Sequence, residues 1–142
     1  MEVSQVNKRV RNAIEDAKAK AQARRNAAAS ADKAYASFLE TVATPIARQV
    51  ANALKVAGVG FTLGTPGGGI RLAADRGRDD YVEFVLDTSG EFPQAAGRVS
   101  VTRGSRTLDE VRPIKAGTAI EDLTEEDVLE FLVTALEPWL ER

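Results

Sequence analysis

The chain has 142 residues, 44% of them hydrophobic and 28% charged, with a formal net charge of −2, which predicts one soluble globular domain with or without an extension. It contains neither cysteine nor histidine, and this excludes disulfides, zinc–thiolate sites and Ser-His-Asp triads. There is no run of 18 apolar residues and no apolar signal core near Met1, so we expect a cytoplasmic protein without a membrane span.

Charge and glycine are unevenly distributed along the chain. Residues 1–30 contain seven basic and three acidic side chains, a local charge of +4, whereas residues 118–142 contain eight acidic side chains and one basic side chain, a local charge of −7. All 11 glycines lie between Gly58 and Gly117. This distribution predicts a long helical segment, then a glycine-rich sheet, then an acidic C-terminal helix.

The first predicted element is a helical arm over residues 1–44, because residues 3–44 lack glycine and proline and are rich in good helix formers. A single helix of this length would extend about 63 Å at 1.5 Å per residue. Ser30 is a candidate N-cap, so a helical hairpin broken near Ser30 is the alternative. One face of the arm carries an apolar stripe at steps of three and four residues: Val3, Val6, Val10, Ile14, Ala17 and Ala21.

Residues 45–142 are predicted to form an α+β domain. Pro45 should kink the chain or open a helix that ends at Gly58, a natural residue after a helix C-terminus. Beyond Gly58 the apolar period changes from 3.6 to 2, and turn-forming residues separate the alternating segments. This pattern predicts a five-stranded antiparallel meander. The expected strands contain Val59–Leu63, Ile70–Ala73, Tyr81–Asp87, Arg98–Thr102 and Thr107–Ile114.

The last strand and the C-terminal helix have specific end signals. Gly104-Ser105 fits a two-residue hairpin turn with glycine first. Pro113 and the Asp109-Glu110 step predict that the last strand is a bulged edge strand. Thr124 is the expected N-cap of an amphipathic C-terminal helix, which Pro138 should bend or end. We expect this helix and the helix that follows Pro45 to cover one face of the sheet.

The other face of the sheet should face water and carries polar side chains. Cross-strand ion pairs would account for them without any ligand. The alternative is a small polar-ligand site, or an enzyme active site, at this face. The candidate residues are Arg71, Tyr81, Glu83, Asp87 and Arg98, with Ser100 and Arg112 nearby.

Basic side chains form a second candidate site, for phosphate groups of a nucleic acid. Nucleic acid is not the favoured partner, because no aromatic residue precedes Tyr35 to stack on bases. Insertion of the arm into a membrane is not expected either, because bulky apolar residues are few. The candidate phosphate contacts are Lys18, Lys20, Arg24 and Arg25 in the arm, and Arg103 and Arg106 at the predicted hairpin.

A cluster of acidic residues, Asp75, Asp79 and Asp80, lies in one predicted turn beside Arg76 and Arg78. The spacing does not match an EF-hand loop and the two arginines oppose a bound cation. We therefore predict a solvated turn whose charges pair with one another.

The sequence favours a non-enzymatic, homo-oligomeric interaction or adaptor protein. A long arm cannot fold wholly onto the remaining residues, and a lone helix is only marginally stable in water. A coiled-coil homodimer through the apolar stripe is the commonest solution to this problem. We expect neither a cofactor nor a metal ion, and the identity of any further protein partner is not encoded in a recognisable motif.

Overall fold

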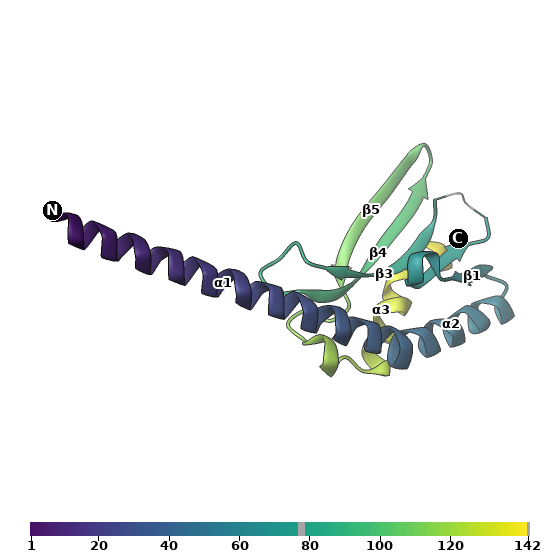
Figure 1. Ribbon diagram of the computed structural model, residues 1–142. Coiled ribbons are helices and arrows are strands. Elements are labelled where there is room, and N and C mark those ends of the chain that lie inside the picture. The colour runs from purple at the N-terminus through teal and green to yellow at the C-terminus, as the bar shows by residue number, and fades with distance from the viewer. Residues whose placement is uncertain (77–78, 142) are drawn as a thin grey trace.

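The computed structural model describes residues 1–76 and 79–141. The first half of the chain is helical, with α1 (Val3–Phe38), a π-helical turn η1 (Leu39–Ala43) and α2 (Thr44–Val56) in direct succession. The predicted break near Ser30 does not form, and the arm is not a hairpin (Figure 1). The residues around Ser30 are mostly alanine, the best helix former, and no glycine is present to end the helix.

The π-helical turn η1 lies immediately before Thr44 and Pro45 in the chain. The Thr44 N–H bonds to the Leu39 carbonyl five residues earlier, which widens the turn. The Thr41 hydroxyl donates to the Ser37 carbonyl at 2.7 Å. Pro45 lies in the first turn of α2 and has no N–H to donate to the preceding turn. The helix axis changes direction here, which turns α2 along the sheet (Figure 1).

The second half of the chain forms a five-stranded antiparallel sheet in the order β1-β2-β3-β4-β5, which confirms the predicted α+β meander. Each strand pairs with the next one in sequence. The strands are β1 (Phe61–Gly64), β2 (Arg71–Ala74), β3 (Tyr81–Asp87), β4 (Gln94–Arg103) and β5 (Arg106–Pro113). A short 3₁₀ turn, η2 (Pro66–Gly68), lies between β1 and β2.

β5 is an edge strand, as predicted, but the predicted bulge is wrong. The register with β4 runs without interruption from Ala96–Pro113 to Arg103–Arg106. Charged residues need no bulge here because β5 is exposed along most of its length. The turn itself is as expected: Gly104 has φ +64° and Ser105 has a negative φ, which suits a two-residue turn with glycine first.

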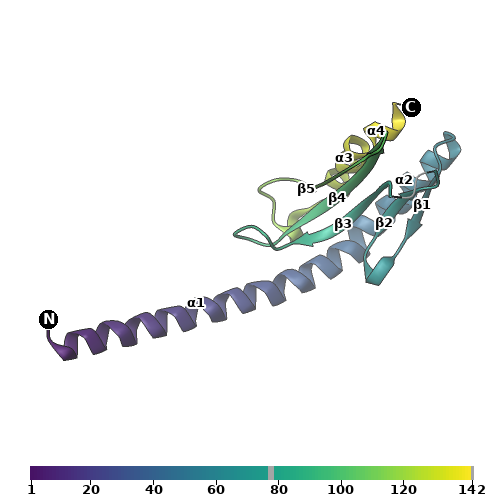
Figure 2. The same cartoon turned by 90° about the horizontal axis from the view of Figure 1, so that it is seen from above.

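Helices cover one face of the sheet (Figure 2). α2 and α3 (Glu125–Ala135) pack side by side. α3 ends before Pro138, which lies in the first turn of the short α4 (Glu137–Leu140). The predicted N-cap is confirmed, since Thr124 and Asp127 form a reciprocal capping box. A 3₁₀ turn, η3 (Ile120–Asp122), leads into it.

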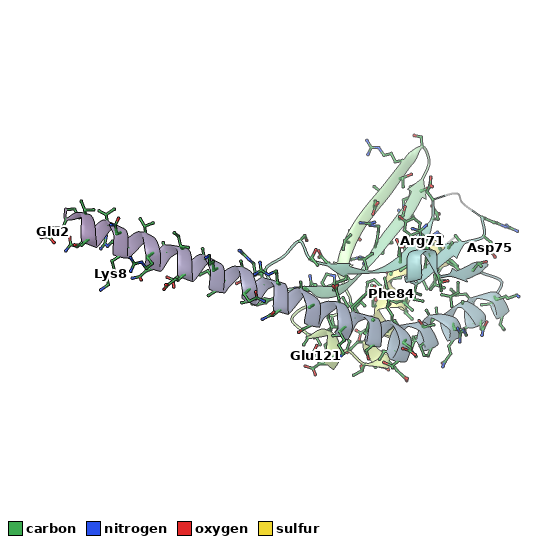
Figure 3. The ribbon with its side chains drawn as sticks, in the orientation of Figure 1. Glu2, Lys8, Arg71, Asp75, Phe84 and Glu121 are labelled. Carbon is green, nitrogen blue, oxygen red and sulfur yellow. The ribbon has the colours of Figure 1, made fainter. Side chains whose placement is uncertain are left out.

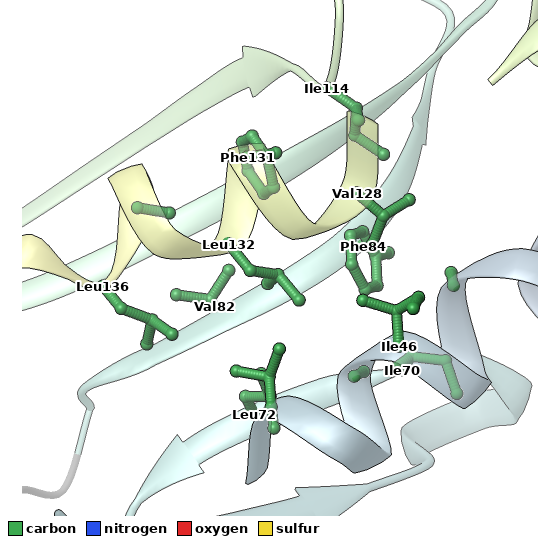
Figure 4. Close-up of a cluster of buried hydrophobic side chains, with 14 of the residues drawn as sticks. Ile46, Ile70, Leu72, Val82, Phe84, Ile114, Val128, Phe131, Leu132 and Leu136 are labelled. Carbon is green, nitrogen blue, oxygen red and sulfur yellow. The ribbon is translucent and has the colours of Figure 1, made fainter. Parts of the chain in front are cut away.

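The core lies between the helices and the sheet. Figure 4 shows Phe84, Val82 and Leu72 of the sheet facing Val128, Leu132 and Leu136 of α3 and its end. Gly97 is buried beneath Phe131, whose ring occupies the space that a β-carbon would need. A strand glycine thus lets α3 approach the sheet closely.

The acidic turn before β3 is not fully solvated, so that prediction needs correction. Asp80 is only 3% exposed, and its carboxylate accepts hydrogen bonds from the Thr102 N–H and from the Trp139 indole. Asp75 instead accepts from the Thr62 hydroxyl at 2.6 Å. Arg78, also expected to pair in this turn, lies outside the described residues.

Candidate functional site

The distal arm, which we define as residues 3–26, projects away from the folded domain (Figures 1 and 3). All of its residues are exposed except Ala21, which is partly buried. Its four bulky apolar side chains remain open to solvent: Val3 is 74% exposed, Val6 43%, Val10 53% and Ile14 50%. The residues of the predicted apolar stripe, including Ala17 and Ala21, therefore lie on the stretch of α1 that packs against no other element of the described residues.

Apart from Val6, the residues of the apolar stripe belong to a longer heptad series in α1. The series continues in alternating steps of four and three residues to the face of α1 that packs on the domain. On that face Phe38 is buried, and Tyr35 and Ala31 are partly buried. A sustained repeat of 3.5 residues is typical of helices that supercoil around a partner. The series is Val3, Asn7, Val10, Ile14, Ala17, Ala21, Arg24, Ala28, Ala31, Tyr35 and Phe38.

Basic side chains flank the apolar stripe. The distal arm contains seven basic and two acidic residues. The candidate phosphate contacts Lys18, Lys20, Arg24 and Arg25 are all exposed, and the Arg25 guanidinium donates to the Gln22 amide oxygen at 2.8 Å. Arg103 and Arg106 lie at the tip of the β4–β5 hairpin, well away from the distal arm (Figures 1 and 2). The two groups of predicted phosphate contacts therefore do not form one surface.

A groove of about 800 Å³ lies where the distal arm joins the domain. Its helical wall is formed by small residues of α1 from Ala27 to Ala34, and the opposite walls by the 90–94 and 117–121 loops. Phe92 is 75% exposed at this groove. Sequence reasoning did not predict the groove, because its walls come from three segments that are far apart in the chain.

The polar face of the sheet is occupied by pairs among its own side chains. The predicted cross-strand pair is present: the Arg71 guanidinium lies 3.1 Å from the Glu83 carboxylate. The same guanidinium lies 4.0 Å above the ring of Tyr81, a cation–π contact. Arg98 is directly opposite Glu83 in the register, yet its ion pair is with Asp109 of β5, at 3.7 Å.

Two further polar residues of this face are also engaged. The Asp87 carboxylate accepts from the hydroxyl and the N–H of Ser89, and these hydrogen bonds hold the pKa of Asp87 below its ordinary value. Ser100 was expected to face water but is 3% exposed, and its hydroxyl donates to the Asp79 carbonyl. The predicted ligand residues are thus near one another in the sheet, but each has a partner within the protein.

Tyr35 is a feature that the sequence did not reveal. Its hydroxyl is buried and forms no hydrogen bond with the described residues. Burial raises the pKa of the Tyr35 phenol above its ordinary value of 10, and the negative charge of Glu83 raises it further. The phenol is therefore neutral across the physiological range.

The described residues contain no cluster of three or more side chains suited to hold a metal ion. Among the helices of residues 1–76 and 79–141, none combines the length and the apolar character needed to cross a membrane. Comparison of the chain with protein-family models, with curated proteins and with solved structures finds no match to any of them.

Proposed function

We propose that this protein is a self-associating interaction protein whose distal arm pairs with the distal arm of a second copy. One observation supports the proposal most directly: bulky apolar side chains repeat along one face of a helix that projects into solvent. Repeated exposed apolar residues are unusual on a monomeric surface and mark sites of association. A two-fold homodimer is the simplest assembly that covers the same face on both copies.

Helix stability supports the same proposal. The distal arm packs against none of the other described residues, and helical stability in proteins comes mainly from the packing of an apolar face. Its half beyond Ile14 contributes only alanines to the stripe, and alanine buries little area at about 25 cal/mol per Å². Pairing with another helix would remove the bulky residues from water and stabilise the arm as a coiled coil.

The polar sheet face offers less support for a ligand-binding or enzymatic function. Arg71, Glu83 and Tyr81 contact one another, so a ligand would have to displace an existing ion pair and a cation–π contact. These contacts are sufficient to explain why the three residues occur together.

The proposal is tested with a double variant and a matched control. Val10→Glu/Ile14→Glu places two charges in the apolar stripe, whereas Asn12→Glu/Ala19→Glu adds the same charge on the opposite face of the same helix. Light scattering should give the wild-type chain and the control about twice the 15.2 kDa chain mass, and the stripe variant the mass of one chain. Circular dichroism should show that only the stripe variant loses arm helicity.

Two results would contradict the proposal. One is a stripe variant with the same mass as the wild type. The other is a wild-type chain that remains monomeric at the highest concentration measured. Because both double variants change the net charge equally, a loss of association in both would indicate an electrostatic contact of the basic residues instead.

A further inference from the structure

We infer that the two distal arms pair in antiparallel orientation, with Ile14 of each copy opposite Ala17 of the other. This inference rests on the proposed self-association and specifies its geometry. In this register Val10 lies opposite Ala21, and Val3 lies opposite Ala28. The apolar stripe thus packs against the apolar stripe of a second copy, which runs in the opposite direction.

Side-chain size favours this orientation. The bulky apolar members of the heptad series within the distal arm, Val3, Val10 and Ile14, lie in its N-terminal half, and apart from Arg24 the members that follow are alanines as far as Ala31. An antiparallel pair places one bulky and one small side chain in each layer, so the helices remain at a constant separation and the layers fill evenly. A parallel pair would place bulky residues together at one end and alanine against alanine at the other, where little apolar area is buried.

The two polar members of the heptad series also favour this orientation. In a parallel pair, Arg24 would face Arg24 across the interface, and two like charges would be brought together within a partly desolvated layer. In the antiparallel register, Arg24 faces Asn7, whose amide oxygen can accept from the guanidinium. A polar pair inside an apolar interface also specifies the register, because any shift of the helices breaks it.

The groove at the base of the arm lies at the end of this interface. In this register Val3 of the second copy lies opposite Ala28. The first helical turn of the second copy then lies beside the wall of the groove that α1 forms, which begins at Ala27. The exposed Phe92 ring lines the same groove. The antiparallel pair therefore brings Val3, in the last helix–helix layer, to the edge of this groove.

The flanking charges predict how the pair responds to salt. In the antiparallel register, Arg11 of one copy lies near Lys18 of the other on the same flank. Salt screens repulsion between such exposed charges. Association should therefore strengthen as ionic strength rises from about 0.05 M to about 0.5 M. A contact between the basic arm and the acidic residues 118–142 of a second copy would weaken over the same range.

Disulfide mapping tests the orientation directly, because the natural chain contains no cysteine. Val10→Cys and Ala21→Cys are prepared as separate full-length variants, oxidised alone and oxidised as a mixture. Intact-mass spectrometry distinguishes the mixed disulfide from the two symmetric ones. We expect the mixed species to dominate the mixture and each variant alone to form little covalent dimer. Ile14→Cys with Ala17→Cys is a second pair, and the outward Ala19→Cys is the control that forms little disulfide.

Each other outcome has a separate meaning. Efficient oxidation of Val10→Cys alone and Ala21→Cys alone would indicate parallel arms and overturn this inference while leaving the proposed dimer intact. A dimer by light scattering that forms neither mixed disulfide, or that weakens as salt rises, would also overturn it. Reduced variants and wild type that are all monomeric would instead refute the proposed function.

Discussion

The indole N–H of Trp139 donates a 2.9 Å hydrogen bond to the carboxylate of Asp80, 59 positions earlier in the chain. Both residues are buried. The other oxygen of Asp80 accepts from the backbone N–H of Thr102 at 2.7 Å, and the Trp139 ring packs edge-on against Phe61 at 5.4 Å. A single carboxylate thus connects the start of β3, the end of β4 and α4, which closes the chain onto its sheet.

This connection predicts strong coupling between the two residues. Asp80→Ala removes the acceptor of both N–H groups, and the loss of a partner by the buried Trp139 indole N–H costs about 1–3 kcal/mol. Trp139→Phe keeps an aromatic side chain but removes the indole N–H donor together with part of the ring. In a double-variant cycle by urea denaturation, the coupling free energy should be about 1–3 kcal/mol. Additive effects of the two substitutions would show that the hydrogen bond contributes little to the stability of the fold.

A second prediction concerns Gly97. A methyl group at this position would overlap the Phe131 ring, so Gly97→Ala must displace α3 or the ring. Overpacking of this kind typically costs about 1–3 kcal/mol. Phe131→Leu should reduce that cost, since it removes the atoms that clash. The check is thermal and urea unfolding of both single variants and the double variant. A double variant that is destabilised by the full sum of the two effects would contradict this account.

A third prediction concerns pH and Tyr35. The folded protein holds the phenol neutral above its ordinary pKa of 10, whereas the unfolded chain loses the proton near that pH. The unfolded state then binds fewer protons, so the free energy of unfolding should decrease as pH rises above 10. Tyr35→Phe removes this contribution, and at neutral pH it should cost little because the hydroxyl has no partner among the described residues.

The measurement for Tyr35 is denaturant unfolding of the wild type and Tyr35→Phe at several pH values between 8 and 11. The two proteins share every other titratable side chain, so the difference between them isolates Tyr35. We expect the wild type to lose stability more steeply above pH 10. Parallel pH profiles for the two proteins would mean that the phenol is not held neutral by the fold.

Much of the fold was predictable because it depends on local patterns. Alternation around Val82 and Phe84 identified a strand, and Thr124 followed by Asp127 marked a helix start. The absence of glycine before Gly58 indicated one helical half of the chain. In each case the structural cause lies within a few residues of its effect, so the sequence alone is informative.

The incorrect and missing predictions depended on distant partners. From the sequence, Asp80 resembles a solvated turn residue, but in the fold it accepts a hydrogen bond from Trp139, which is far away in the chain. Ser100 was predicted to face water, but its hydroxyl donates to the Asp79 carbonyl. The β5 bulge was inferred from composition alone, whereas the register was fixed by pairing with β4. The exposure of the apolar stripe could be established only from the complete fold, because it depends on whether another element covers the stripe.

Sedimentation equilibrium of the unmodified chain over a wide concentration range tests the central claim most directly. We predict a reversible monomer–dimer equilibrium that approaches twice the 15.2 kDa chain mass and shifts toward the dimer as salt is added. A single species of one chain mass at every concentration and salt would contradict the account, because the exposed stripe of the distal arm would then have no second copy to cover it.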